Sequence, residues 1–424
     1  TDWQVSYDGR KREPAQLPVK FPLLLAQGAE GIAVGLSTKI MSHNFCELID
    51  ASIKYLRKEP FELYPDFLTG GLVDVREYND GKRGGRIRVR AKLEIVDKKT
   101  LKITEIPFGT TTSDLIDSIL KANEKGKIKI KKVLDNTAKD VEILIELQPQ
   151  VSPSVTVDAL YAFSDCELSI SPNTCVIIGD KPHFIGVSEA LRLSTDTTVE
   201  LLKRELEIEL KELEDKWHFS SLEKIFIEER IYRDIEEEET WEGVIKAIDT
   251  GLEPFKKILM REVTEEDIVR LTEIKIKRIS KFDKKKADEY IKGLEDAMEE
   301  TKKNLKSLIK FAIKYFEDLL KKYGKGKERK TEIAIFDTVE VKQVAANNEK
   351  LYVNRAEGFI GYGKDLKKEE FISECSDIDD IIAFTKDGTL KVVRNSEKVF
   401  VGKDIIHVAV WKKNDERTTY NVVY

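Results

Sequence analysis

Residues 20–45 read KFPLLLAQGAEGIAVGLSTKIMSHNF. Three glycines, Gly28, Gly31 and Gly35, divide this apolar stretch, and the large aliphatic Ile32 directly follows the second of them. Glycine at this density lets a backbone come close to another surface, because no Cβ stands in the way. A single aliphatic side chain among small residues can also enter a DNA base step as a wedge. From these residues alone, ordinary close packing of a strand or turn is the more common interpretation.

Charge is distributed unevenly along the chain. The net charge of −6 argues at first against a nucleic-acid partner. Residues 81–139, however, hold sixteen Lys and Arg against seven Asp and Glu, whereas residues 200–242 hold seven against sixteen. This asymmetry indicates that one region meets a polyanion and that another is kept away from it, although two solvated faces would give the same counts.

The remaining composition excludes several classes of protein. Charged residues make up 35% of the chain, and no apolar run approaches the roughly 18 residues of a membrane span. The four cysteines show no CxxC spacing and none of the four histidines stands in an HExxH arrangement, so we expect no metal site. Scattered single cysteines are typical of a reducing compartment. We therefore expect a cytoplasmic protein without a membrane partner.

The first part of the chain alternates in the manner of β-strands. In the segment from Arg86 to Arg90, period-two alternation places Arg86, Arg88 and Arg90 on one face of a strand and two aliphatic residues on the other. Further strands are predicted over 101–106 and 141–147, and a helix capped by Ser113 is predicted over 113–125.

Helical periodicity begins near residue 198. Thr197 and Glu200 have the spacing of a capping box, which predicts the start of a helix. Apolar residues then recur at spacings of three and four: Val199, Leu202, Leu206, Leu210, Leu213 and Trp217, and later Leu294, Met298, Thr301, Leu305, Leu308, Ala312, Tyr315 and Leu319. The two stripes predict an antiparallel coiled coil with an inserted tip, and a helical bundle is the alternative. The first helix would be roughly 30 Å long, and the second, if continuous over 284–322, roughly 60 Å.

Residues 331–424 return to strand patterns. Asp387 and Gly388 stand between the alternating segments IIAFT and TLKVV, which predicts a hairpin. Fewer than about a hundred residues of this kind are typical of the opening of a longer repeat. The basic, glycine-containing segment Gly324–Lys330 before them is the expected hinge.

Five motifs occur in the same order in the A subunits of bacterial type IIA topoisomerases, which the chain resembles over essentially its whole length. They are YDGRKREP (7–14), GIAVGLSTKI (31–40), PDFLTGG (65–71), TEIPF (104–108) and YGKGKERKTEI (323–333). The family comprises gyrase A and topoisomerase IV A. The AQG before the wedge favours the topoisomerase IV type, because gyrase A usually has a turn richer in Asn and Ser. The glutamine-arginine-glycine box that would mark gyrase does not occur in residues 331–424.

The resemblance implies a multidomain α+β fold with four parts. These are a mixed α/β tower domain, the DNA-gate arm (1–187), an antiparallel coiled coil (188–218 and 283–323), a helical exit-gate dimerisation tip (219–282), and the start of an all-β C-terminal pinwheel (331–424). The family cleaves DNA with a tyrosine that follows an arginine in a winged-helix domain. None of the thirteen tyrosines here follows an arginine. We therefore expect a C-terminal fragment that contains no catalytic residue, with the nucleophile upstream.

The resemblance also implies a set of DNA-binding residues. Ile32 falls on the isoleucine that intercalates into the gate duplex and helps to bend it. The basic residues around the predicted strand would contact phosphates of the outer duplex arm: Lys82, Arg83, Arg86, Arg88 and Arg90. Lys39, His43 and Asn44 follow the wedge and are further candidates for the DNA backbone. The family usually has prolines before this His-Asn pair, where this chain has Met41 and Ser42, and a buried or merely surface His43 is the alternative.

The activity that the resemblance implies is ATP-driven passage of one duplex through a transient break in another. The chain has no GxxxxGK[ST] phosphate loop, and in this family ATP and Mg²⁺ are bound by the partner B subunit, so we expect no cofactor on this chain. The expected partners are double-stranded DNA, a second copy through 219–282, and the B subunit. The alternatives are the gyrase A subunit, a non-catalytic coiled-coil DNA clamp, and an independent nuclease, against which stands the lack of clustered metal-binding residues.

Overall fold

The computed structural model describes residues 1–336, 349–412 and 418–421. The chain divides into two units, each treated separately below. The first comprises Thr1–Leu23, Cys46–Glu62 and Glu189–Gly326, and the second Leu24–Phe45, Leu63–Ser188 and Lys327–Tyr424. Both helices and sheets are present, so the predicted mixed α+β class is confirmed. Parts of the predicted 331–424 domain, namely 337–348, 413–417 and 422–424, lie outside the described residues.

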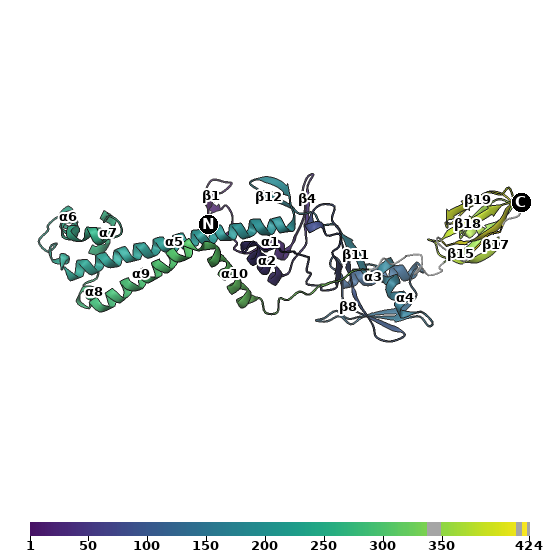
Figure 1. Ribbon diagram of the computed structural model, residues 1–424, viewed down its shortest axis with the longest axis horizontal. Coiled ribbons are helices and arrows are strands. Elements are labelled where there is room, and N and C mark those ends of the chain that lie inside the picture. Colours follow the sequence, from purple (N-terminus) through teal and green to yellow (C-terminus); the bar gives the residue numbers. More distant parts are fainter. Residues whose placement is uncertain (337–348, 413–417, 422–424) are drawn as a thin grey trace. The chain divides into compact units, whose positions relative to one another are not determined.

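The first unit is built on a pair of antiparallel helices, α5 (Val187–Glu228) and α9 (Lys284–Lys306) (Figure 1). Contacts along the pair run in opposite directions: Glu214 pairs with Lys302, Trp217 with Glu295, Lys224 with Asp288, and Glu228 with Lys284. Trp217, Leu294 and Met298 form a buried cluster between the helices. Residues of both apolar stripes therefore meet in one cluster between two antiparallel helices.

The boundaries of these helices differ from the prediction. Thr197 is not a cap, because α5 already begins at Val187 and the Thr197 hydroxyl donates to Leu193 O at 2.9 Å inside the helix. Helix α5 has 42 residues, about 63 Å at the rise of an α-helix, so the estimate of roughly 30 Å for the first helix was wrong. The second helix is not continuous. It breaks at Ser307 into α9 and α10 (Leu308–Tyr323).

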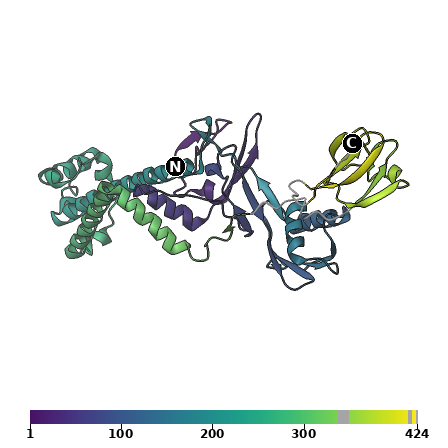
Figure 2. The ribbon, with the colours of Figure 1, turned by 45° about the vertical axis from the view of Figure 1, so that its right-hand side comes forward.

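Short helices form a separate cluster where α5 ends and α9 begins (Figures 1 and 2). They are η2 (Ile231–Arg233), α6 (Trp241–Leu252), η3 (Glu253–Ile258), α7 (Glu265–Thr272) and α8 (Ile276–Ser280). Their shared core includes Phe226, Ile248 and Leu271. Helix α7 begins with a complete capping box, in which Thr264 and Asp267 bond each other's backbone N–H.

The remainder of the first unit lies beside the helix pair. It contains β1 (Trp3–Val5) paired with β2 (Arg12–Pro14), and most of α2 (Phe45–Leu56). Arg204 of α5 pairs with Asp2, and Lys20 pairs with Glu205. These ion pairs fasten the N-terminal segment to α5.

Two four-stranded sheets form the centre of the second unit. The first has the order β11 (Glu167–Ile170), β6 (Ile87–Arg90), β5 (Leu72–Asp74) and β14 (Glu332–Ile333), with β14 parallel to β5. The second has the order β7 (Lys92–Ile95), β8 (Thr100–Glu105), β10 (Ile143–Leu147) and β9 (Ile130–Asp135). Helices α3 (Thr112–Glu124) and α4 (Pro153–Phe163) complete its core. The predicted strands and helix are confirmed, but Thr111 rather than Ser113 caps α3, accepting from Asp114 N at 3.2 Å.

Two hairpins and a short helix accompany these sheets. Helix α1 (Leu23–Gln27) leads into β3 (Ala29–Ile32) and β4 (Ser37–Ile40), which form a two-stranded sheet with each other among the described strands. Strands β12 (Cys175–Ile178) and β13 (Lys181–Phe184) form the second hairpin. A tight turn, η1 (Asn79–Gly81), precedes β6.

The C-terminal residues form two further sheets around their own core of Leu351, Ile360 and Ile381 among others. One has the order β17 (Glu370–Cys375), β15 (Glu349–Asn354), β16 (Phe359–Gly361) and β20 (Val399–Phe400). The other has the order β19 (Leu390–Arg394), β18 (Asp380–Thr385) and β21 (Ile405–Trp411), and η4 (Lys364–Leu366) links β16 to β17. The hairpin predicted at Asp387 and Gly388 is confirmed, with Gly388 at φ +85°.

The segment predicted to be a hinge is fixed over its second half. The Arg329 guanidinium donates to the carbonyls of Tyr64 and Pro65 at 3.0 and 2.8 Å, and the Asp66 carboxylate accepts from Lys330 N and Thr331 N. These bonds belong to the second unit and continue into β14. The boundary between the two units falls within the predicted hinge, between Gly326 and Lys327, and Arg329 and Lys330 lie on the side of the second unit.

Candidate nucleic-acid interface

The β3–β4 hairpin presents aliphatic side chains to solvent. Ile32 is 92% exposed and Val34, in the loop, is fully exposed. A Cβ added to Gly31 or Gly35 would meet nothing within 4 Å, so the backbone between them is bare as well. Large aliphatic residues at such exposure are unfavourable in water. The arrangement is suitable for an apolar wedge, Ile32, at the end of a two-stranded hairpin.

Lys39 lies on the same hairpin. Its Nζ pairs with Glu30 Oε1 at 2.9 Å, directly across from it in the strand register, and the side chain is 35% exposed. The backbone of Lys39 exchanges two hydrogen bonds with Asn173, at 2.8 and 3.0 Å. Lys39 therefore links β4 to the loop before β12, and its side chain remains partly exposed.

His43, a DNA contact in the sequence prediction, lies inside the protein. It is 4% exposed, and its ring nitrogens lie 3.3 Å from Leu25 O and 3.1 Å from Tyr78 Oη. Burial lowers the pKa of His43 to about 4, so the ring is neutral. Because the carbonyl only accepts, Nδ1 carries the proton and Nε2 accepts from Tyr78. The prediction that His43 contacts DNA directly is corrected, and the ring instead joins α1 to the turn before β6.

Asn44 has a similar internal role. It is 5% exposed, and its Nδ2 donates to Asp66 Oδ2 at 2.9 Å and to Lys327 O at 3.0 Å. The side chain helps to fix the segment that leads to β14. Its assignment to the DNA backbone is likewise corrected.

Lys82 and Arg83 are exposed in the loop before β6. The loop leaves a turn in which Asn79, Asp80 and Gly81 all have positive φ, from +51° to +69°. Asn, Asp and Gly are the residues that adopt this left-handed conformation most readily. Asp80 is held in it by accepting from Ser188 N and Oγ at 3.0 and 2.8 Å. The structure thus fixes a tight turn at the base of a basic loop.

The three strand arginines differ in their surroundings. Arg86 is half exposed and pairs with Glu77. Arg88 and Arg90 have side chains only 21% and 11% exposed, because Arg88 pairs with Asp74 and Glu167, and Arg90 pairs with Glu167. The predicted alternation is confirmed. Because these guanidinium groups are mostly buried and already pair with carboxylates, we assign Arg88 and Arg90 to holding the sheet together.

Asp74 is the centre of that internal network. Its carboxylate accepts from Arg76, Arg88 and the backbone N of Phe336. Hydrogen bonding from Arg76, with smaller contributions from Phe336 N and Arg88, holds the pKa of the Asp74 carboxyl well below its usual range. The carboxylate therefore stays charged and holds Arg88 within the fold.

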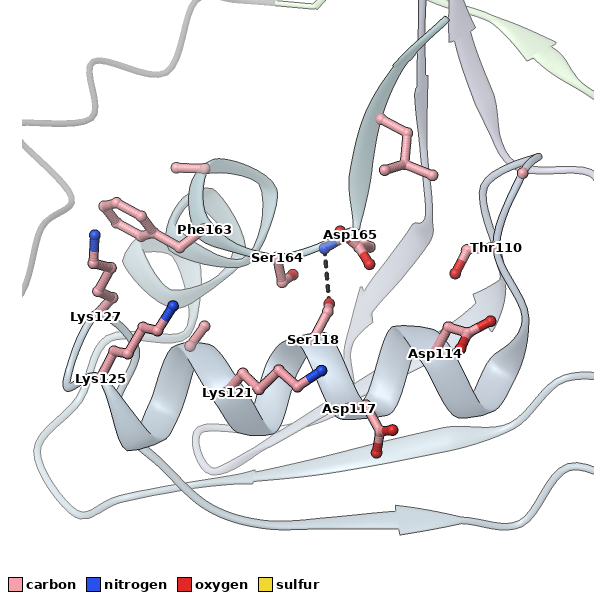
Figure 3. A pocket seen from close by; sticks show the side chains of 14 residues that line it. Thr110, Asp114, Asp117, Ser118, Lys121, Lys125, Lys127, Phe163, Ser164 and Asp165 are labelled. Atoms are coloured by element: carbon pink, nitrogen blue, oxygen red, sulfur yellow. Dashed lines mark hydrogen bonds between the residues drawn. The ribbon is translucent and has the colours of Figure 1, made fainter.

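The largest cavity among those described lies between α3 and the end of α4, and measures about 810 Å³ (Figure 3). Asp114 and Asp117 stand toward the N-terminal end of α3, and Lys121 and Lys125 toward its C-terminal end. This order complements the helix dipole. The charges are therefore explained by the helix itself, and we assign no ligand to the cavity.

Among the described residues no group of three or more His, Cys, Asp or Glu could hold a metal ion. Of the helices described, none is both long and apolar enough to cross a membrane.

Sequence reasoning missed three residues that form this surface or support it from below. Val34 stands between Gly31 and Gly35 as Ile32 does, so its exposure could have been inferred from the GIAVG motif. Asn173 and Thr174 contact the hairpin and the basic loop from more than ninety residues away. No local pattern marks such contacts.

Comparisons with known proteins identify the family of the chain. A family model for the A subunit of DNA gyrase/topoisomerase IV matches residues 1–317, and one for the topoisomerase C-terminal domain of Bacteroidota matches residues 350–424. The A subunit of DNA topoisomerase 4 from Borreliella burgdorferi is 37% identical over 426 residues, covering 100% of this chain and 67% of that protein. The DNA gyrase A subunit of Lawsonia intracellularis is 33% identical, covering 51% and 28% of the two chains. That of Brachyspira hyodysenteriae is 26% identical, covering 81% and 44%.

The chain therefore spans about two thirds of the first relative and less than half of the other two. The family model covers well over half of the chain, and the identity to the Borreliella protein extends along all of it. By both measures, the chain belongs to the family of DNA gyrase and topoisomerase IV A subunits.

Proposed function

We propose that this chain is the DNA-binding and gate-forming part of the A subunit of a type IIA topoisomerase of the topoisomerase IV type. The observation that carries the proposal is the hairpin with an isoleucine 92% exposed, in a chain of this family. The exposed basic residues of the loop before β6 add to it. A duplex bent around Ile32 would recover the cost of unstacking a base step through contacts to more protein.

In this proposal the DNA contacts divide into two kinds. Ile32 enters a base step, and Lys39, Lys82, Arg83 and Arg86 contact phosphates, which gives affinity and position but little sequence specificity. The other four residues that the sequence suggested as DNA contacts are assigned to hydrogen bonds and ion pairs within the protein: His43, Asn44, Arg88 and Arg90.

The proposed parts of the chain follow the same scheme. Residues 1–187 form the tower, 188–218 and 283–323 the coiled coil, and 219–282 a tip that meets a second copy; 331–424 begin a pinwheel. Support comes from the antiparallel α5–α9 contacts, from the separate core of the tip, and from the C-terminal family match. A dimer contact at the tip would keep two subunits together while DNA is broken elsewhere.

The proposed reaction of the complete enzyme is ATP-driven passage of one duplex through a transient double-strand break in another. We assign ATP and Mg²⁺ to the B subunit. No tyrosine of this chain follows an arginine, so we assign it binding and bending rather than cleavage. The gyrase A subunit is the nearest alternative, and the topoisomerase IV type is favoured by the relative that matches all of this chain.

A duplex labelled at both ends with a fluorescence-transfer pair tests the proposal with the chain as it stands. Binding should be accompanied by increased transfer, because bending brings the labels together. A coiled-coil clamp that encircles DNA would bind without shortening the distance between the ends. Binding without increased transfer would therefore favour the clamp and contradict the proposal.

A further inference from the structure

One short segment, residues 173–175, hydrogen-bonds to the β3–β4 hairpin, called here the wedge hairpin. Among the described strands, β3 and β4 pair only with each other. The backbone N and O of Asn173 bond Lys39 at 3.0 and 2.8 Å, and the Asn173 side chain Nδ2 donates to Ser37 O at 2.7 Å. Cys175 N adds a bond to Thr38 Oγ1 at 3.3 Å. Asn173 and Cys175 thus form hydrogen bonds to three consecutive residues of β4, Ser37, Thr38 and Lys39.

The residue between them holds the basic loop. Thr174 is 1% exposed, and both its N and its Oγ1 donate to Gly81 O, at 3.2 and 2.9 Å. Gly81 closes the turn that leads into Lys82 and Arg83. A Cβ at Gly81 would lie 3.2 Å from Thr174 Oγ1 and 2.7 Å from Val187. Thr174 therefore packs closely against the turn, and no larger side chain fits at Gly81 while Thr174 and Val187 stay in place.

The side-chain amide of Asn173 has one end bonded and the other end unsatisfied. Its Oδ1 is buried and has no hydrogen-bond partner in the described part of the chain, and an orphaned buried acceptor is destabilising. The amide orientation follows from chemistry, since the Ser37 carbonyl can only accept. The donor bond to β4 is thus retained although the other end of the amide is unsatisfied.

We propose that Asn173 and Thr174 form a brace that joins the wedge hairpin to the basic loop and fixes the position of the bend relative to the phosphate contacts. The inference rests on the proposed function, because it assigns these residues to positioning Ile32 and Arg83 for DNA. Adjacent residues of one segment hold the two elements, so neither can move independently of the other. Asn173 and Thr174 are positioning residues that do not touch the duplex.

Time-resolved fluorescence transfer on an end-labelled duplex tests the brace, because it reports both the mean and the spread of end-to-end distances. Thr174→Val removes the hydroxyl bond to Gly81 at constant shape. We expect it to reduce the bend-dependent change in transfer at least two-fold and to widen the distance distribution, with the Kd changed less than two-fold. Thr174→Ser keeps the hydroxyl and should restore both values.

A second variant keeps the test decisive if Thr174→Val does not fold. Asn173→Ala leaves the Thr174–Gly81 bonds intact and removes only the amide bond to Ser37, and it should also widen the distribution. A purely structural role would instead give a less stable protein that binds less DNA with an unchanged distribution, which overturns the proposal. If the unmodified chain binds without bending, the proposed function itself fails. If it bends, and Thr174→Val and Asn173→Ala match it in mean and width, only the brace is refuted.

Discussion

Arg90 and Glu167 face each other across β6 and β11, with Arg90 Nε 2.5 Å from Glu167 Oε2. The guanidinium of Arg90 also lies over the rings of Tyr161 and Phe336, 4.4 and 4.2 Å from their centroids. A cation so enclosed contributes to the fold, whereas a phosphate-binding arginine must be reachable from solvent. The same strand region therefore carries arginines in two different surroundings, half exposed at Arg86 and enclosed at Arg90, for which we propose two different functions.

Salt dependence of DNA binding should separate these functions. Replacing Lys82, Arg83 and Arg86 with glutamine removes three exposed charges, and the slope of log K against log salt should fall by about 2–3 units, near 0.9 for each lost phosphate contact. Fluorescence anisotropy of a labelled duplex at several salt concentrations measures this slope.

Arg90→Gln provides the matched comparison. It should leave the slope unchanged and lower the free energy of unfolding by about 3 kcal/mol, because Glu167 loses the closer of its two arginine partners in a mostly buried site. A reduced slope with unchanged stability would indicate that Arg90 contacts DNA and would contradict our assignment.

Ile32→Ala should affect bending more than binding. The variant removes the group that unstacks the base step, while the phosphate contacts that dominate affinity remain. We expect the bend-dependent fluorescence transfer to fall by about half or more and the Kd to rise by about three-fold or less. Ser37→Ala, at the position opposite Ile32 in the hairpin register, is the control and should behave as the unmodified chain. Equal bending by all three proteins would rule out Ile32 as the wedge.

Much of the architecture was accessible from periodicity. The alternation around β6 and the spacing of the two helical stripes indicated the correct elements, since both patterns depend on which face of an element is buried. The first residue of α5 could not be predicted from the local sequence. Asp80, more than a hundred residues earlier, accepts from Ser188 N and Oγ in the first turn of the helix, whereas the local capping signature at Thr197 is an exposed threonine inside it.

The candidate site was predictable only in its exposed parts. Ile32 and Lys82 were predicted from residue type and local sequence alone, and both lie on the surface. The burial of His43, Asn44 and Arg90 depends on Leu25, Tyr78, Asp66 and Glu167, which the fold brings to them. Residue type alone does not distinguish a basic residue that binds DNA from one that binds the protein's own carboxylate.

Acid should destabilise the second unit through His43. Burial lowers the pKa of this ring from 6.5 to about 4, opposed in part by Asp66, so the folded protein binds a proton less readily than the unfolded chain. The stabilisation is present above pH 6.5 and is lost as the pH falls toward 4, about 3 kcal/mol in total.

Comparison with His43→Asn isolates this contribution from other titrating groups. Urea unfolding of both proteins between about pH 7.5 and pH 4 should show the difference in stability shrinking as the pH falls, because only the unmodified chain must take up a proton at this position. A difference that stays constant with pH would mean that His43 does not titrate on unfolding.

The two threonines with capping signatures should respond in opposite ways to alanine. Thr264 accepts from Asp267 N, and its own N–H bonds the Asp267 carboxylate, at 3.3 and 3.0 Å. Thr264→Ala should therefore cost about 1–2 kcal/mol and speed hydrogen exchange of the α7 amides by about five- to thirty-fold. Thr197→Ala places a better helix former at an exposed position within α5, and exchange of the α5 amides should stay the same or slow slightly. Mass spectrometry of peptides from α5 and α7 measures both, each helix serving as the control for the other. Faster exchange in α5 on replacing Thr197, with α7 unaffected by Thr264→Ala, would mean that the helix begins where the local sequence placed it.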